Sequence, residues 1–445
     1  MEKKNPRVCG YSYYKSLDLP IQKNINIINY KTTVNSVIIP TISYSNYNTN
    51  LVDIDSIYNP GSFKSLVTQN SGITYGTVYI LFPNGKKIQY VAVDGSGLSE
   101  SQYTNPGYVI NQYNSGNLNV INFSGTMTNT DKYNFDGYTA GIWFTLFIYE
   151  EYGRVGIFDT NDSVLLSVVN VNFTNAFWNG YYMTYGNSSG SGSITPLTTL
   201  DIVGHEMMHG ITDLSNGLVY QKESGAINES ISDIFGSVLE LFYDNKSGKN
   251  LFDWDIGEDA FPGALRSMSN PNLYGQPDCY LGTYWFPTSN PSDSGGVHTN
   301  SGVGNYLFYI LCVATTGTND FNYNYTTTTV FPVLSLAKLI YYYLTGKTGY
   351  RSMASTVSYY TYCNDIIYNA KIFITNNTLN TELNITIDTA IRAVNVKIAT
   401  DPKPKPKKRI RRPRYVPRRH NRIQRRRRIV QKRYKRRHVP YYPRK

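Results

Sequence analysis

Apolar side chains recur at helical spacing in two neighbouring segments near the middle of the chain. The first segment begins with three helix start signals, Thr198, Thr199 and Asp201. Its predicted buried face follows and consists of Ile202, Val203, Met207, Met208 and Ile211. The second segment has one apolar side, formed by Ile227, Ile231, Ile234 and Val238. Two further apolar stretches, 306–314 and 330–344, are too short for a membrane span or are interrupted by Lys338, so they predict buried helices.

The second predicted helix also has an acidic side. At 100° per residue, Glu229, Asp233 and Glu240 fall within about 40° of one another, and Glu229 and Glu240 lie ~16 Å apart along the axis. Because the isoleucines need the opposite side, these carboxylates are predicted to face inward. Burial there is costly unless the carboxylates are paired or bind cations. A solvated acidic face is the alternative.

Histidine is rare in this chain, and two histidines stand four residues apart. Of five histidines, only His205, His209 and His298 precede residue 401. In the first predicted helix, His205 and His209 lie one above the other and can aim ring nitrogens at one tetrahedral Zn²⁺, with Glu206 beside an open coordination position. A helix with two surface histidines is the alternative. A catalytic zinc site also needs a third protein ligand, and the acidic side of the second helix offers one.

The net charge is divided between two parts of the chain. The 445 residues include 43 Lys and Arg against 31 Asp and Glu, a formal charge of +12. Residues 401–445 hold 22 of these basic residues and one acid, so their charge is +21 and that of residues 1–400 is −9. The basic segment cannot form a core and is predicted to be disordered. A hydrophobic content of 41% excludes a wholly disordered chain and suffices for a two-lobed body.

Cysteines and the N-terminal sequence bear on the compartment. The four cysteines lie far apart without a C-x-x-C pair, at Cys9, Cys279, Cys312 and Cys363. This spacing indicates neither a disulfide framework nor a cysteine zinc site, and unpaired thiols suit a reducing compartment. Residues 1–20 contain no continuous apolar run, so no secretory signal peptide is recognised, and no apolar stretch of the sequence is long enough to predict a transmembrane segment. We therefore expect an intracellular, nuclear or virion-associated location rather than secretion.

Several separated motifs occur in an order that resembles the thermolysin family of zinc metallopeptidases. They are Asn175–Gly180 (NAFWNG), Asp201–Gly210 (DIVGHEMMHG), Gly217–Glu229 (GLVYQKESGAINE), Arg266–Ser269 (RSMS) and Asp293–Gly302 (DSGGVHTNSG). The resemblance covers about residues 63–397 and implies an α+β fold. A β-rich N-terminal lobe, an active-site helix at the junction and a mainly α-helical C-terminal lobe are expected. The expected boundaries are 1–62 for an N-terminal extension, 63–216 and 217–397 for the two lobes, and 398–445 for a disordered basic tail.

The resemblance assigns the zinc ligands and the general base. His205, His209 and Glu229 would bind Zn²⁺. Glu206 would take a proton from the water that attacks the peptide carbonyl. Asp233 would be the hydrogen-bond partner that orients His205 and raises its basicity.

The resemblance also implies groups that contact the substrate. His298 and Tyr220 would donate hydrogen bonds to the oxyanion of the tetrahedral intermediate, and Asp293 would orient His298. An edge segment would pair with the substrate backbone, and it contains Asn175, Ala176 and Trp178. Arg266 would donate hydrogen bonds to a substrate carbonyl. The family's pocket positions are apolar here: Leu197, Ile202, Ile256 and Leu265. They imply cleavage before bulky hydrophobic residues with broad specificity, since an apolar pocket discriminates by only ~1–3 kcal/mol per methylene.

A calcium site follows from the same resemblance. Its ligands would be five carboxylates, which are the hard oxygen donors that Ca²⁺ prefers: Asp201, Glu240, Asp253, Asp255 and Glu258. The chain departs from the family in having five more residues between Glu240 and Asp253, and in having Asp255 where the family usually has Glu. A surface acidic loop is the alternative.

The expected function is that of a zinc-dependent endopeptidase acting on peptide or protein substrates, with calcium as a second cofactor. Residues 402–445 are expected to associate with nucleic acid or to direct targeting. A solubilising or weakly membrane-attracted tail is the alternative. An alternative for the whole chain is a nucleic-acid-associated structural protein with a catalytically silent peptidase scaffold. The presence of Glu206 and His298 counts against it, because a scaffold needs neither.

Overall fold

The structure of the chain, a computed structural model, describes residues 50–53, 77–82, 84–121, 129–187 and 196–399. The chain divides into two compact units, residues 1–399 and 400–445, and the description concerns the first. Apart from residues 50–53, the expected N-terminal extension lies outside the described residues. The basic tail expected over 398–445 also lies outside them, apart from its first two residues.

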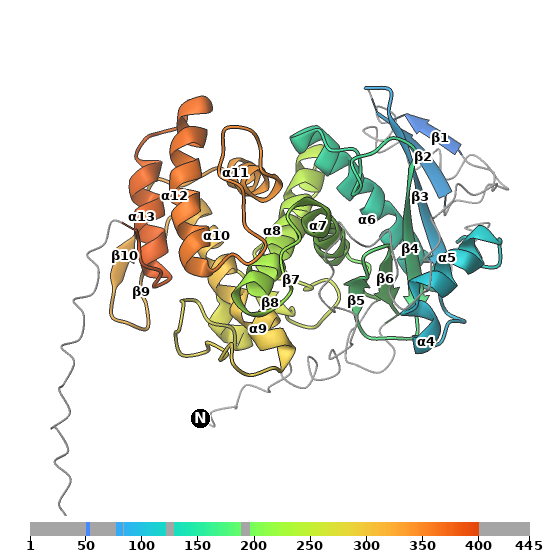
Figure 1. The fold of residues 1–445 in the computed structure, drawn as a ribbon, viewed down its shortest axis with the longest axis horizontal. Coiled ribbons are helices and arrows are strands. Elements are labelled where there is room, and N and C mark those ends of the chain that lie inside the picture. The colour runs from blue at the N-terminus through green and yellow to red at the C-terminus, as the bar shows by residue number, and fades with distance from the viewer. Residues whose placement is uncertain (1–49, 54–76, 83, 122–128, 188–195, 400–445) are drawn as a thin grey trace, which may run out of the picture. The chain divides into compact units, whose positions relative to one another are not determined.

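A six-stranded mixed sheet forms the N-terminal lobe (Figure 1), with strand order β1-β2-β3-β4-β6-β5. Its strands are β1 (Asn50–Asp53), β2 (Thr77–Leu81), β3 (Lys87–Asp94), β4 (Ser163–Val171), β5 (Ala176–Trp178) and β6 (Met183–Gly186). The β1/β2, β3/β4 and β4/β6 pairs are parallel, whereas β2/β3 and β5/β6 are antiparallel. The three-residue strand β5 is therefore the last strand at one side of the sheet.

Helices cover both faces of this sheet, which explains why β3 is apolar at consecutive positions. Val91 and Val93 share a core with α5 (Pro106–Asn114), which follows the short helix α4 (Glu100–Tyr103). Tyr90 and Ala92 point to the other face and share a core with α6 (Asn129–Tyr152). Strands buried on both faces lose the apolar–polar alternation of a half-exposed sheet.

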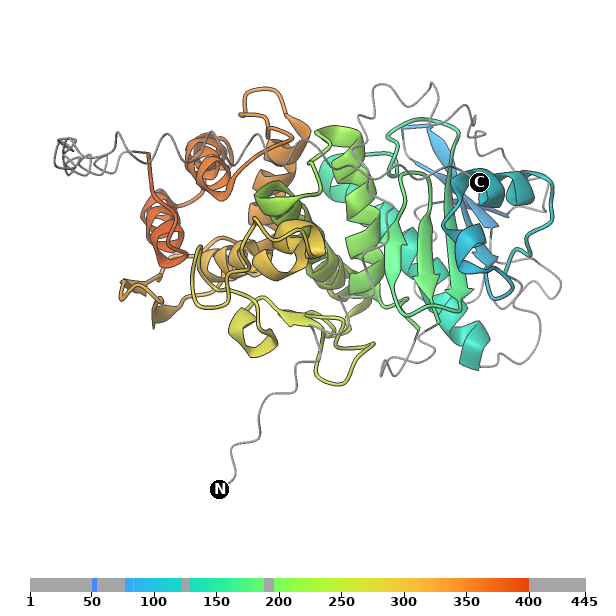
Figure 2. The same cartoon turned by 60° about the horizontal axis from the view of Figure 1, so that its bottom comes forward.

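Two long helices, α7 (Leu200–Ser215) and α8 (Lys222–Ser247), lie between the sheet and the C-terminal helices, as Figures 1 and 2 both show. They cover the two helices predicted from apolar spacing, and they run in opposite directions. The two backbones approach closely: a Cβ on Gly236 would lie 2.5 Å from the Asp201 carbonyl oxygen, and one on Gly204 would lie 3.1 Å from Gly236 Cα. Only glycine permits this spacing of the helix pair.

The C-terminal lobe is mainly helical, as predicted. Its helices are α9 (Asp293–Asn300), α10 (Gly302–Cys312), α11 (Val333–Thr345), α12 (Tyr359–Asn376) and α13 (Leu383–Ala393), with a 3₁₀ turn η2 (Pro271–Tyr274). Two small antiparallel sheets pair β7 (Asp255–Ile256) with β8 (Arg266–Ser267), and β9 (Thr316–Thr318) with β10 (Asn324–Thr326). The helices expected near 306–314 and 330–344 correspond to α10 and α11. None of the described helices has the length and apolarity needed to span a bilayer. The predicted two-lobed α+β architecture is confirmed.

Candidate metal centre and active site

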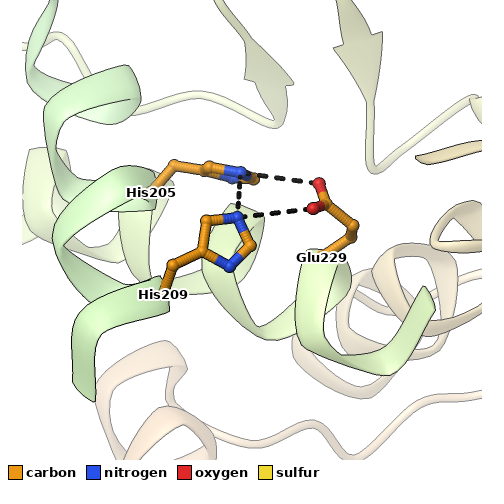
Figure 3. Close-up of side chains that lie close together, drawn as sticks. All are labelled: His205, His209 and Glu229. Carbon is orange, nitrogen blue, oxygen red and sulfur yellow. Dashed lines mark hydrogen bonds and ion pairs between the residues drawn. The ribbon is translucent and has the colours of Figure 1, made fainter. Parts of the chain in front are cut away.

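Three side chains from the central helix pair converge in the interior. His205 and His209 project from α7 and Glu229 from α8 (Figure 3), and all three are buried. The two Nε2 atoms are 3.0 Å apart, His205 Nε2 lies 3.5 Å from Glu229 Oε2, and His209 Nε2 lies 3.3 Å from Glu229 Oε1. Two imidazole nitrogens and a carboxylate that face one another are a ligand set that suits Zn²⁺ and leaves a position for water.

The other ring nitrogen of each histidine has a partner of its own. His205 Nδ1 lies 2.8 Å from Asp233 Oδ1, and His209 Nδ1 lies 2.9 Å from Asn228 Oδ1 and 3.1 Å from Ser232 Oγ. These contacts fix the orientation of both rings and direct Nε2 toward the ligand position. The role of Asp233 was expected from the resemblance, whereas Asn228 was not identified. Its position next to Glu229, four residues before Ser232 on the same helix face, is the local signal that could have found it.

Asp233 is itself held by groups from two other elements. Arg266 donates from Nε to Asp233 Oδ2 at 2.9 Å and from a terminal nitrogen to Oδ1 at 2.6 Å, and Asn305 donates to Oδ2 at 2.8 Å. Burial raises the pKa of Asp233, but the Arg266 charge and the His205 hydrogen bond outweigh it and hold the pKa at about 2. Arg266, expected to bind a substrate carbonyl, is thus a partner of Asp233. Asn305, in α10, was not identified from the sequence.

Electrostatics also favour an ionised Glu229. Burial raises its pKa, but the nearby charges of His298 and His209 outweigh it and hold the pKa well below the ordinary value. The pKa of His209 is raised to about 9, because the Glu229 carboxylate exceeds the opposing effect of burial. The Glu229 carboxylate is therefore ionised and available to a cation, whereas His209 must release its proton before it can bind zinc.

Glu206 lies beside the ligand group and contacts the edge strand. It is buried, and its Oε2 accepts a hydrogen bond of 3.1 Å from the backbone N–H of Trp178, the last residue of β5. Within the same segment, Ala176 is buried and the Asn175 carbonyl accepts a hydrogen bond from Gly186 N. The structure therefore places the segment expected to bind substrate next to the expected general base.

His298, Tyr220 and Asp293 form a second hydrogen-bonded set at the same place. His298 Nδ1 lies 2.5 Å from Asp293 Oδ1, and His298 Nε2 lies 3.0 Å from the Tyr220 hydroxyl and 3.5 Å from Glu229 Oε1. The Tyr220 hydroxyl also donates to Glu229. Residues 293–296 all have positive φ, and glycine at Gly295 and Gly296 accommodates this without a Cβ penalty. This left-handed run lets Asp293 reach back to both the ring and the backbone N–H of His298.

The expected pocket positions lie in the main core. Leu197, Ile202 and Ile256 are buried, and Leu265 is partly buried against the same cluster. The structure thus brings these four apolar side chains into one core. Their contact with a substrate side chain stays a prediction.

A second group of carboxylates lies farther along the same helix pair. Asp201, Glu240 and Glu258 place one oxygen each within 4.8 Å of one another. Glu240 has 0% exposure, and both of its carboxylate oxygens are buried without a hydrogen-bond partner. Burial and the charges of Asp201 and Glu258 raise the pKa of Glu240 to about 12, and burial and Asp201 raise the pKa of Glu258 to about 9. Oxygen ligands that lack an internal counter-charge fit a hard cation such as Ca²⁺.

Two of the five expected calcium ligands lie outside this group. Asp255 begins the strand β7, and its backbone N–H donates to Asp253 Oδ1 at 2.7 Å. Asp253 is exposed, and it acts on Glu240 through its charge rather than as a member of the 4.8 Å group. The structure therefore supports three of the five carboxylates as one ligand set.

Comparison with known proteins finds two matching family domains along the chain. Models of the thermolysin metallopeptidase family match residues 63–213 with the catalytic domain and residues 216–396 with the alpha-helical domain. Bacillolysin of Bacillus cereus is 50% identical over 145 residues, which cover 32% of this chain and 24% of that protein. Thermolysin of Alicyclobacillus acidocaldarius subsp. acidocaldarius is 44% identical over 185 residues, which cover 39% of this chain and 31% of that protein. The matches thus span about a quarter to a third of the length of these relatives.

A solved structure shares the fold at lower identity. The precursor of protealysin, a metalloproteinase from Serratia proteamaculans, superposes with a TM-score of 0.50 at 23% identity, over 69% of this chain and 87% of that chain. This likeness concerns the fold alone.

The expectation of an intracellular, nuclear or virion-associated location is wrong. Homologues in the thermolysin family are secreted extracellular proteases. The expectation depended on unpaired thiols and on the lack of a recognised signal sequence. Cys279, Cys312 and Cys363 are buried free thiols, so their packing separates them from solvent oxidants and they carry little information about the compartment.

Proposed function

Because the chain belongs to the thermolysin family of zinc metallopeptidases, we propose that it is an endopeptidase that hydrolyses peptide bonds with a catalytic zinc ion. The family uses Zn²⁺ and Ca²⁺, and the His205, His209 and Glu229 group fits the zinc. The observation that carries the proposal is the buried convergence of these three side chains beside Glu206, with both histidines oriented by partners of their own.

The proposed chemistry divides between the metal and the side chains around it. Zinc held by His205, His209 and Glu229 supplies Lewis-acid polarisation of the scissile carbonyl. Glu206 accepts the proton of the attacking water and passes it to the leaving amine. Geometry supports this role, because the carboxylate is buried next to the ligand group and is held by the Trp178 N–H.

Oxyanion stabilisation falls to His298 and Tyr220 in this proposal. Their donor atoms lie 3.0 Å apart on the same side of Glu229, so both can donate to the charge that develops on the carbonyl oxygen. Asp293 binds His298 Nδ1 and thereby keeps Nε2 directed at the site. The outer edge of β5 would pair with an extended peptide through backbone hydrogen bonds, which suits a broad substrate range.

Cleavage of a generic peptide by the zinc-loaded protein tests the proposal, with Glu206→Gln as the decisive variant. We expect Glu206→Gln to bind one zinc and to lose about 10²- to 10⁴-fold in kcat. Glu151→Gln is the matched control, since Glu151 forms only a partly exposed ion pair with Lys338. Equal activity of wild type and Glu206→Gln would contradict the role of Glu206, whereas no cleavage and no zinc in either would support the catalytically silent scaffold instead.

We further propose that the site prefers a bulky apolar residue just after the cleaved bond. Leu197, Ile202 and Leu265 are apolar and belong to one core cluster, which supports this preference. A peptide series that varies only this residue should give kcat/KM values about 10- to 200-fold higher for Leu or Phe than for Gly. A flat series would contradict the preference without affecting the peptidase proposal.

We also propose that residues 402–445 bind nucleic acid without sequence preference. The formal charge of +21 over residues 401–445 supports the proposal, since each phosphate contact releases condensed counterions. Retention on DNA should fall steeply with salt for the full chain and be lost in a chain that ends at Thr400. Identical retention of both proteins would contradict it.

A further inference from the structure

Trp178 contacts helix α7 at three residues along one side of the helix. Its backbone N–H donates to Glu206 Oε2 at 3.1 Å, and its indole Nε1–H donates to Asp213 Oδ2 at 2.8 Å. Between these two contacts its ring lies over Gly210, where a Cβ would be 3.4 Å from the indole Cε2. Positions 206, 210 and 213 are spaced four and three residues apart, so they share one face of α7.

The contact with Asp213 fixes the indole ring of a buried residue. Trp178 has 4% exposure, and its single side-chain donor is the indole N–H, which must be satisfied when the ring is buried. Phe158 packs against the same ring, with the two ring centroids 6.4 Å apart. Rotation of the ring would therefore break the hydrogen bond to Asp213 and disturb this packing.

The same tryptophan links the edge strand to the general base. The backbone of Trp178 ends β5, which pairs with β6 through Trp178 and Met183. A shift of the Trp178 ring would move this backbone, and with it both the N–H that holds Glu206 and the edge expected to bind peptide. Displacements near 1 Å at a catalytic group can cost about 10²-fold in rate.

We propose that Asp213 is a positioning residue, which holds Trp178 so that its backbone N–H fixes Glu206 and β5 in register with the metal centre. This inference rests on the proposed peptidase function. Among the described residues, the Asp213 side chain hydrogen-bonds Trp178 and none of the expected zinc ligands, and it acts on His209 through its charge alone. A purely structural role would instead lower the stability of the fold and leave kcat/KM of the folded protein unchanged.

The test compares Asp213→Leu with Asp213→Asn in the full-length, zinc-loaded protein. Leucine cannot accept the indole hydrogen bond, so we expect kcat/KM to fall about 10- to 100-fold at unchanged zinc content. Asparagine keeps an acceptor oxygen in the same place and should restore kcat/KM to within about threefold of wild type. Asp365→Leu is the control, since it removes a hydrogen bond from Tyr343 and an ion pair with Arg351 far along the chain in α12. It should lower the melting temperature and leave kcat/KM unchanged.

A second variant keeps the inference testable if Asp213→Leu does not fold. Trp178→Phe retains an aromatic ring but lacks the indole donor, so it should lose a similar factor in kcat/KM. Adding Asp213→Ala, which removes the acceptor with a smaller side chain, to Trp178→Phe should cost nothing more, because the bond is already absent. Unchanged kcat/KM in a folded, zinc-bound Asp213→Leu, or full additivity of the two losses, overturns the inference. A wild type that cleaves no peptide would instead contradict the proposed function.

Discussion

The helix pair α7 and α8 carries two groups of buried acids whose charges are balanced in opposite ways. At one end, Glu229 and Asp233 face histidines, an arginine and hydrogen-bond donors, and their pKa values are lowered. At the other end, Glu240 faces further carboxylates and its pKa is raised to about 12. The difference teaches that the first group is assembled by the protein itself, whereas the second needs a bound cation to be stable in its ionised form.

The two groups differ in what a bound metal ion would change. A zinc ion entering the first group meets side chains that are already oriented, with Glu229 ionised, and displaces the proton of His209, so binding would change the fold little. A calcium ion entering the second group would relieve repulsion among carboxylates, so binding there would contribute directly to stability. We therefore expect zinc to control activity and calcium to control unfolding.

The largest expected effect is the loss of zinc and activity when the Glu229 carboxylate is replaced by an amide. The matched exchange at the other end of the helix pair is Glu240→Gln. Glu229→Gln should lose stoichiometric zinc and at least about 10³-fold in kcat/KM, because several kcal/mol of transition-state stabilisation depend on the metal. Glu240→Gln should keep its zinc and most of its activity. Metal analysis and peptide cleavage measure both variants. Loss of zinc in Glu240→Gln would break the separation of the two groups.

Removal of calcium should have the next largest effect, and it should act on stability. With Ca²⁺ at 100 times its dissociation constant, linkage predicts about 2.7 kcal/mol of stabilisation. Melting is best followed in the Glu206→Gln background, which cannot digest itself, in zinc-containing buffer with and without calcium. Glu240→Gln should abolish most of the calcium response. An equal calcium response in that variant would place the ion elsewhere.

Replacement of Asp233, the hydrogen-bond partner of His205, should weaken zinc binding although all three zinc ligands remain. Asp233→Asn loses the charge that orients His205 and leaves Arg266 with a neutral partner, so zinc affinity should fall about 10- to 100-fold. Competition with a chromophoric chelator measures this affinity. Asp365→Asn, on α12, should bind zinc as wild type does. Unchanged affinity in Asp233→Asn would mean that Asn228 and the backbone alone orient the ligands.

A pH slope is expected in the calcium-free protein, and per pH unit it is smaller than the effect of calcium. Glu258 has a folded pKa of about 9 against an ordinary value of 4.5, so between these values the folded state binds more protons than the unfolded state. Stability should therefore fall as pH rises through this window, by up to about 1.4 kcal/mol per unit for each proton retained. Calcium should flatten the slope. Asp233 acts in the opposite direction, because its contribution is lost as pH falls from 3.8 toward 2. A calcium-free stability that rises between pH 5 and 8 would contradict the raised pKa values.

Local spacing explains what could be predicted from the sequence. The apolar faces of α7 and α8 and the four-residue interval between His205 and His209 are properties of single helices, so they are visible in the sequence. The partners of these residues come from distant segments. Asn305 is 72 residues from Asp233 and Arg266 is 33 residues away, and no local pattern connects them.

The expected calcium ligands could likewise be predicted reliably only where they lie on a helix. Asp201 and Glu240 lie on the predicted helices and meet in the structure, whereas Asp253 and Asp255 lie in a loop and a two-residue strand whose course depends on the pairing of β7 with β8. Helical periodicity carries no information about that course. Asp213 was missed for a related reason: its importance arises from the indole of Trp178, 35 residues earlier.

The close contact of Gly204 with Gly236 implies that the two metal groups cannot vary independently of each other. A single methyl group added at Gly236 would press on the Asp201 backbone and spread α7 from α8, which would widen the histidine–glutamate spacing and the carboxylate cluster together. Tolerance to mutation should therefore be lowest at this crossing, although neither glycine binds a metal. In an evolutionary lineage, the helix pair would be inherited as one module, with its two ions gained, kept or lost under a shared geometric constraint.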